Sequence, residues 1–329
     1  APFGSSLVAL RLMVFVCALA GLLAFWRLWL RARRETGSPG STTLPALFLL
    51  ASYPYFLSLS GLFMSEPPAL ALCLASMLCY LNWRRGRSWT MLALTLLAAT
   101  AAIYIRQYSL FLPAAYAVGE LAAPAGRRGS WLLMLLPVVA FLPLVLFWHG
   151  LVPAGLQFRH YPGLALTNLS SILIWTGFVC LPWAMLYLFR LRRFNPWLLI
   201  ALTAVPLVLI APLPGAGIVR SLLAVLPDPL PGIAAVLLAL AGGVALVLVC
   251  SRLSATCVTA RTSALSVLFL LLILAFGGPT LYERHFLPVV PLLLLAFSET
   301  IRPLPALVWG LVVQLPLAIV QIARLTGRV

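Results

Sequence analysis

Long apolar stretches separated by short polar gaps run along the whole chain. Residues 7–30, 231–250 and 264–276 are predominantly apolar and show no alternation between apolar and polar positions. This pattern predicts helices, because the strands of a membrane barrel would alternate. A backbone in the hydrocarbon core of a bilayer must also satisfy its own hydrogen bonds, which favours helices as the spanning elements.

The pattern predicts an all-α, polytopic transmembrane helix bundle of about twelve helices, forming a single transmembrane domain over residues 1–329. Several stretches are shorter than the roughly 20 residues of a comfortable span, so tilted or re-entrant segments are expected. The stretches lie near residues 6–30, 43–62, 67–83, 89–104, 108–122, 131–148, 168–189, 196–213, 231–250, 264–278, 286–298 and 305–323.

Composition makes a water-soluble protein untenable. The 329 residues are 63% hydrophobic and 9% charged, against about 45–50% and 25% in soluble domains. So few charges cannot cover so much apolar surface in water. We therefore expect a multi-pass integral membrane protein, placed in a bacterial plasma (inner) membrane.

All 22 basic residues are arginine, and they set the predicted orientation. The net charge is +16, but no basic run is interleaved with aromatic residues in a soluble segment, so nucleic acid is not an expected partner. Arginines instead follow every second apolar stretch. By the positive-inside rule these gaps face the cytoplasm, and residue 1 lies outside.

The remaining gaps share the opposite, outer face and differ chemically. They hold a few isolated charged groups of both signs beside aromatic residues, at the ends of apolar helices. This face is where we expect a site. The gaps are residues 64–68, 104–108, 149–167, 214–231 and 282–285.

Glu66 is the most informative acid in these gaps. It precedes Pro67-Pro68, which suits the first turn of a helix, so it is equally interpretable as a capping carboxylate. The functional interpretation is a carboxylate that orients a sugar hydroxyl or holds a divalent metal such as Mg or Mn. Tyr53 and Tyr55, in the preceding stretch, suit an aromatic belt or a platform for sugar stacking.

Arg106-Gln107 is the second signal. An arginine at a membrane boundary with no acid nearby in sequence needs an anion, and phosphate fits its planar fork. The alternative is that Arg106 snorkels to lipid headgroups. Gln107 adds hydrogen-bonding capacity that snorkelling does not need, so we favour a phosphate site.

Two further gaps contribute candidates. Tyr282 and Glu283 precede Arg284 and His285, which together could make a second anion contact, with Tyr282 as a substrate contact. Glu283 is expected to pair with Arg284 or to face water. In the longest outer gap, Arg159-His160 could help to cover a site.

These residues resemble the GT-C superfamily of membrane glycosyltransferases, in particular its protein-mannosyltransferase-like branch and the glucosyltransferases of lipid-linked oligosaccharides. The resembling segments, in order, are Arg11-Leu12 with the basic cluster 31–34, Tyr53-Pro54-Tyr55, residues 64–68, Arg106-Gln107, and residues 282–291.

The resemblance implies transfer of a sugar from a polyprenyl-phosphate donor to a glycan, lipid or protein acceptor at the extracytoplasmic face. Arg106, Gln107, Arg284 and His285 would bind the phosphate, and Glu66 would orient the acceptor or a metal. Membrane lipid would surround the donor's tail.

The sequence departs from the family in one place. The family carries a catalytic Asp in its first outer loop, whereas here the first Asp is Asp228. We therefore expect that the first helix and its loop, with the principal base, are missing from this chain, and that it could be an inactive fragment. The alternatives are a multi-pass transporter or flippase of an anionic lipid-linked substrate, and a non-catalytic membrane scaffold.

Overall fold

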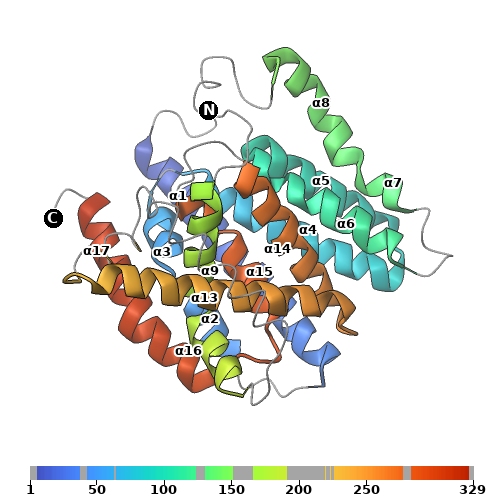
Figure 1. Cartoon of the computed structure of the whole chain (residues 1–329). Helices are drawn as coiled ribbons and strands as arrows, with labels where there is room; N and C mark the ends of the chain where they lie inside the picture. Colours follow the sequence, from blue (N-terminus) through green and yellow to red (C-terminus); the bar gives the residue numbers. More distant parts are fainter. Residues whose placement is uncertain are drawn as a thin grey trace.

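The chain folds as a bundle of helices, and the computed structural model shows no strand among the residues it describes (Figure 1). It describes residues 6–37, 43–62, 64–123, 130–150, 166–190, 219, 223, 226–276 and 283–325. The α-helices are α1 (Leu7–Glu35), α2 (Thr43–Ser52), α3 (Pro54–Ser60), α4 (Glu66–Gly86), α5 (Trp89–Ile105), α6 (Phe111–Leu121), α7 (Trp131–Met134), α8 (Leu136–Trp148), α9 (Leu166–Arg190), α13 (Leu230–Ser251), α14 (Val258–Phe276), α15 (Val289–Ala296), α16 (Pro303–Trp309) and α17 (Leu315–Leu325). Short 3₁₀-helices are η2 (Gln107–Leu110), η5 (Arg252–Ser254) and η6 (Glu283–Phe286), and η7 (Gly310–Gln314) is a π-helix.

α4 is the central helix for the candidate site. It packs between α1 and α5, and Gly21 of α1 faces Ala71 of α4, where an added Cβ would make ordinary van der Waals contact at 3.5 Å. Pro67 and Pro68 begin α4 because proline has no N–H to lose in the first turn. At 1.5 Å per residue, its 21 residues extend about 30 Å, so its two ends lie far apart in the bundle.

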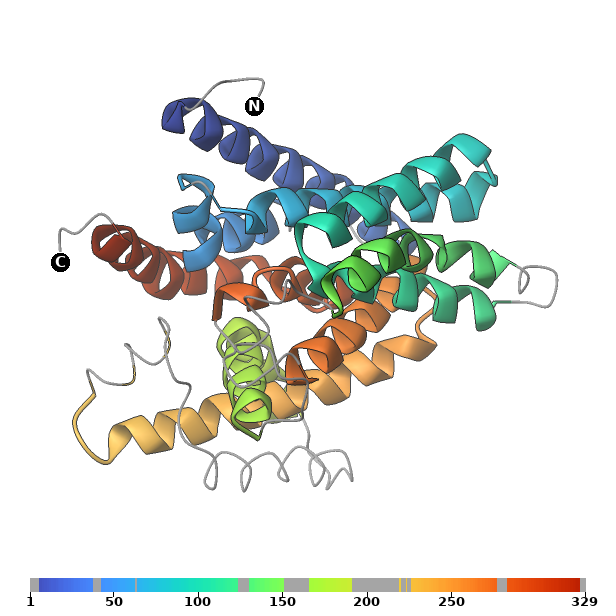
Figure 2. The same cartoon turned by 90° about the horizontal axis from the view of Figure 1, so that it is seen from above.

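α9 and α13 cross each other (Figure 2), and each helix has a glycine at the crossing. A Cβ added at Gly177 would clash with the carbonyl oxygen of Leu238, and one added at Gly242 would clash with that of Leu173. Such close approach lets dispersion contacts hold helices together where no hydrophobic effect acts between them.

The expectation of about twelve helices is not confirmed as a number of spans. In the part of the chain that the structure describes, six helices are long and apolar enough to cross a bilayer, or seven if α2 and α3 form one broken span. Those two helices meet at 67° because Tyr53, before Pro54, adopts an extended conformation. Apolar stretches over-count spans because α15 has only eight residues and α5 only 17. The stretch expected near residues 196–213 lies outside the described residues.

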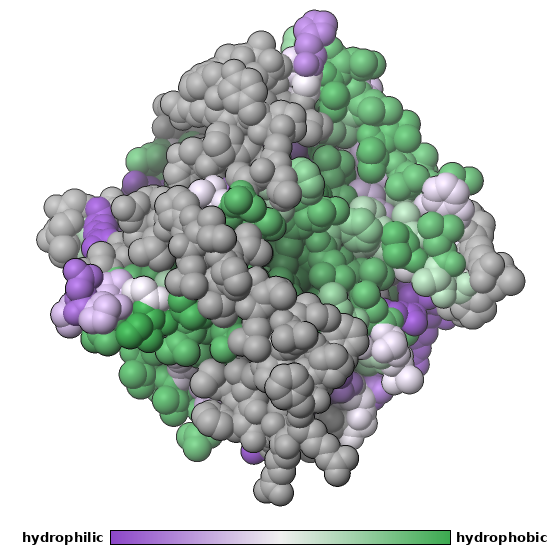
Figure 3. All heavy atoms as spheres, in the orientation of Figure 1, coloured by the Kyte–Doolittle hydropathy of each residue, from purple (hydrophilic) through white to green (hydrophobic). Residues whose placement is uncertain are grey.

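The outer surface of the bundle is apolar, as a lipid-facing surface must be. Large side chains such as Val8, Leu146 and Phe147 are mostly exposed. Apolar residues cover broad areas of the described surface in Figure 3, with polar residues gathered towards its edges. Together with the span lengths, this identifies a multi-pass membrane protein.

The basic gaps that the structure describes, those after α1, α4, α13 and α15, converge on one end of the bundle, which we call the basic end. Here Arg31 of α1 donates to Asn82 of α4 over 2.8 Å, and the Thr259 N–H of α14 donates to Glu35 over 2.9 Å. Glu120 of α6, fully buried, lies 3.0 Å from Arg84. These contacts join the ends of α1, α4 and α6 to the start of α14, which is the clustering that the alternation of basic gaps predicts.

Candidate functional site

Three charged residues that are far apart in the sequence meet at the opposite end of α4. Nη2 of Arg106 lies 2.6 Å from Oε1 of Glu66, and Nε of Arg284 lies 3.6 Å from the same oxygen. The carboxylate comes from the first residue of α4, one guanidinium from the end of α5, and the other from η6. We call these three residues the charged triad.

The local backbone conformation places the Arg106 and Glu66 side chains of the charged triad. α5 ends where Arg106 turns extended, with φ −147° and ψ 114°, and the chain then enters η2. The break points the Arg106 side chain towards the start of α4. Glu66 sits in the first turn of α4, where the positive end of the helix dipole stabilises a carboxylate.

The charged triad combines one buried carboxylate with two partly exposed guanidiniums. Glu66 is 0% exposed, whereas the Arg106 and Arg284 side chains are 25% and 35% exposed. One carboxylate therefore faces two guanidiniums, and both guanidiniums remain reachable from outside the bundle. Oε2 of Glu66 is buried without a hydrogen-bond partner among the described residues. The arrangement suits an anion that approaches the two arginines.

Tyr108 and His285 flank the charged triad, with their ring centroids 6.3 Å apart. The Tyr108 hydroxyl is buried and has no hydrogen-bond partner in the described part of the chain. Burial raises the pKa of Tyr108, so the phenol stays protonated and can donate a hydrogen bond. Sequence reasoning did not select Tyr108, although its position two residues after Arg106 in the same polar gap was a usable signal.

The structure corrects one premise about Arg106. The absence of a nearby acid in the sequence predicted an arginine in need of an external anion, but Glu66, 40 residues away, supplies an anionic partner. Glu66 is thus a first-turn carboxylate and also an ion-pair partner.

The donor set does not fit a divalent metal at Glu66. Its carboxylate already faces two guanidiniums, which repel a cation. In the described ranges, no group of three or more His, Cys, Asp and Glu residues could hold a metal ion. We derive no metal-dependent step from this arrangement.

The remaining candidates do not join the charged triad in a described contact. Tyr53 and Tyr55 are buried in the hydrophobic core, so neither offers an open ring face for sugar stacking or lies at a lipid interface as a belt residue would. Gln107 is half-buried at the start of η2. Arg159, His160 and Tyr282 lie outside the described residues.

Comparisons with known proteins add no assignment. The chain matches no family model, no curated protein and no solved structure.

Proposed function

We propose that the chain is an integral membrane glycosyltransferase that transfers a sugar from a polyprenyl-phosphate donor to an acceptor at the extracytoplasmic face. The observation that supports this most directly is the charged triad, in which two partly exposed guanidiniums share one buried carboxylate. A phosphate linked to a lipid is the natural anion for such a site at the end of a membrane helix.

In the proposed reaction, an acceptor hydroxyl oxygen forms a bond to the anomeric carbon of the sugar. The bond from that carbon to the phosphate oxygen breaks, and its electron pair leaves with the polyprenyl phosphate. Arg106 and Arg284 stabilise this growing negative charge. The hydroxyl proton goes to a general base, a role that we assign to none of the residues in the charged triad.

Glu66 acts here as a positioning residue. Its Oε1 holds the two guanidiniums at one place, and its buried location keeps both arginines from swinging freely towards water. Tyr104 and Ile105, next to Arg106, carry exposed side chains. They offer a lipid-facing approach by which a donor with a long apolar tail can reach the arginines.

The test uses the full-length protein purified in lipid and supplied with a radiolabelled polyprenyl-phosphate sugar and a panel of acceptors. Release of polyprenyl phosphate is expected. Arg106→Ala should lower the rate about 10²–10³-fold, the usual effect of removing one charge-stabilising donor. Arg106→Lys, which keeps the charge near Glu66 but loses the planar fork, should lower it by less.

Arg252→Ala is the matched control. Arg252 is also a partly exposed arginine in an ion pair, 2.7 Å from Glu299, but it lies at the basic end. Its loss should leave the rate unchanged. Equal effects of the Arg106 and Arg252 variants would contradict the proposal. No turnover with any donor, together with movement of a labelled anionic lipid between leaflets, would instead establish a flippase.

A further inference from the structure

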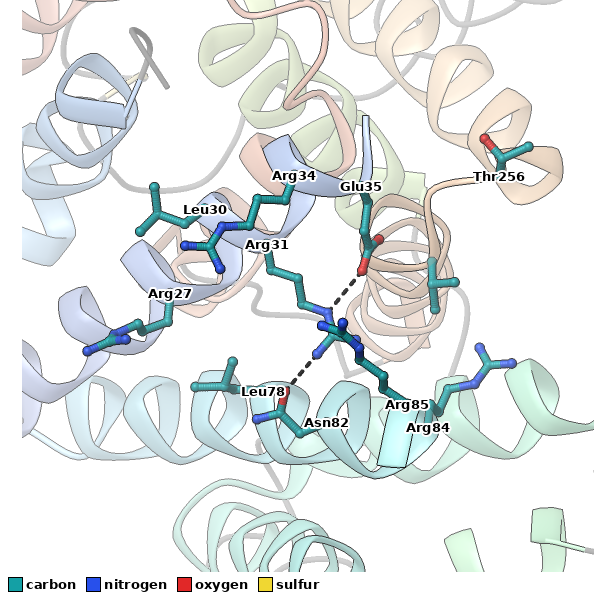
Figure 4. Close-up of a pocket in the computed structure, with 11 residues that line it drawn as sticks. Arg27, Leu30, Arg31, Arg34, Glu35, Leu78, Asn82, Arg84, Arg85 and Thr256 are labelled. Atoms are coloured by element: carbon teal, nitrogen blue, oxygen red, sulfur yellow. Dashed lines mark hydrogen bonds and ion pairs between the residues drawn. The ribbon is translucent and has the colours of Figure 1, made fainter. Parts of the chain in front are cut away.

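A second polar site lies at the basic end, some 20 residues along α4 from Glu66. It is a cavity of about 1090 Å³ between α1, α4 and the start of α14 (Figure 4). Its polar lining is dominated by guanidinium groups, with one carboxylate and one amide. These residues are Arg27, Arg31, Arg34, Glu35, Asn82, Arg84 and Arg85.

Most of this positive charge has no acidic partner. Arg31 pairs with Glu35 over 2.9 Å, and Arg84 pairs with the buried Glu120 behind the cavity. The other three arginines of the lining make no ion pair within the described part of the chain: Arg27, Arg34 and Arg85. A cavity with this surplus charge attracts anions.

An apolar groove adjoins the cavity on the neighbouring side of α1. The groove has a volume of about 810 Å³ and is lined by side chains of α1, α2 and α16, including Leu23, Trp26 and Phe48. Arg27 lines the cavity and the preceding residue, Trp26, lines the groove; the guanidinium of Arg27 lies 5.4 Å from the centre of the Trp26 ring. A polar compartment and an apolar one are therefore lined by neighbouring segments of the same helix, residues 22–26 and 27–35 of α1.

We propose that the cavity and groove together bind an anionic phospholipid. The phosphate headgroup occupies the arginine-lined cavity, and an acyl chain lies in the groove. The recognised chemistry is a phosphate ester, which a free phosphate shares, but only a lipid fills both compartments. The proposal does not depend on the proposed transferase function, because the charged triad lies at the other end of α4.

Convergence of the arginines distinguishes this site from ordinary orientation signals. The positive-inside rule requires arginines near one membrane surface but does not require them to line one cavity. Here arginines of α1 and α4 line one cavity (Figure 4). Their planar donors match phosphate oxygens, and anionic lipids of the cytoplasmic leaflet are the nearest abundant source.

The experiment measures lipid retention by native mass spectrometry after extraction from vesicles of phosphatidylcholine with a minority of phosphatidylglycerol. Wild type should retain phosphatidylglycerol preferentially. Arg34→Gln and Arg85→Gln should each weaken this preference by about fivefold, the usual contribution of one arginine near a charged surface. Trp26→Ala should reduce retention of the lipid while leaving binding of glycerol phosphate unchanged.

Arg302→Gln is the control, because Arg302 is exposed near the basic end but lines neither compartment. Equal loss of preference in the Arg302 and Arg34 variants would mean that diffuse surface charge alone attracts the lipid, and would overturn the proposal. Calorimetry with inorganic phosphate provides the second arm. If inorganic phosphate binds but phosphatidylglycerol is not retained in preference to phosphatidylcholine, the cavity binds a free anion, and the lipid proposal is wrong.

Discussion

Glu66 and Arg106 should be strongly coupled in stability, and substituting the arginine should cost more than substituting the glutamate. We consider Arg106→Gln, Glu66→Gln and the double variant. Arg106→Gln leaves a carboxylate that is fully buried, and within the described part of the chain its remaining charged partner is Arg284, 3.6 Å away. Uncompensated buried charges of this kind cost about 3–5 kcal/mol.

Glu66→Gln should cost less, about 1–2 kcal/mol, because the two guanidiniums it releases are already partly exposed and can turn towards water. Once the carboxylate is gone, the Arg106 side chain has little left to stabilise. The double variant should therefore be about as stable as Glu66→Gln alone. The expected coupling energy therefore equals the cost of Arg106→Gln, about 3–5 kcal/mol, at or above the upper end of the range for contacting residues.

Unfolding in mixed micelles, titrated with SDS and followed by tryptophan fluorescence, measures the four free energies of the cycle. Arg252→Gln provides a baseline, since its partly exposed pair with Glu299 should contribute only about 0–1 kcal/mol. Additivity of the two substitutions within about 0.5 kcal/mol would refute the argument. It would mean that Glu66 and Arg106 do not share an ion pair in the membrane.

Two other predictions concern parts of the bundle away from the charged triad. Gly242→Ala should destabilise the protein by about 1–3 kcal/mol, because its Cβ would meet a backbone carbonyl that cannot move aside; Gly232→Ala on the same helix, where nothing lies within 4 Å, should be neutral or slightly stabilising in the same SDS titration. Glu120→Gln should lower the free energy of unfolding by about 3–5 kcal/mol, because it leaves the buried guanidinium of Arg84 without its carboxylate partner. Glu299→Gln, which removes a partly exposed carboxylate, should lower it by less than about 1 kcal/mol. Equal losses in either pair would show that burial does not govern the cost.

The candidate site was only partly predictable. Glu66 and Arg106 stand out in the sequence as isolated charges beside apolar stretches, and Arg284 stands out in a short polar gap with Glu283 and His285. Their direct contact could not be derived, because it depends on how three helix ends are placed around α4. The same contact changes the role expected for Glu66, from a metal or acceptor ligand to the partner of two arginines.

Three properties of the protein follow from the sequence alone: its membrane environment, its all-helical class and the grouping of arginines in alternate gaps. Each depends on local quantities, namely the hydropathy of a stretch of about 20 residues and the arginines that follow it. The tertiary structure decided which apolar stretches are long, straight helices, since the bend at Tyr53 and the crossing at Gly177 and Gly242 arise from backbone geometry and packing. It also decided which charges meet, because an ion pair depends on a distance of a few ångströms between segments that are far apart along the chain.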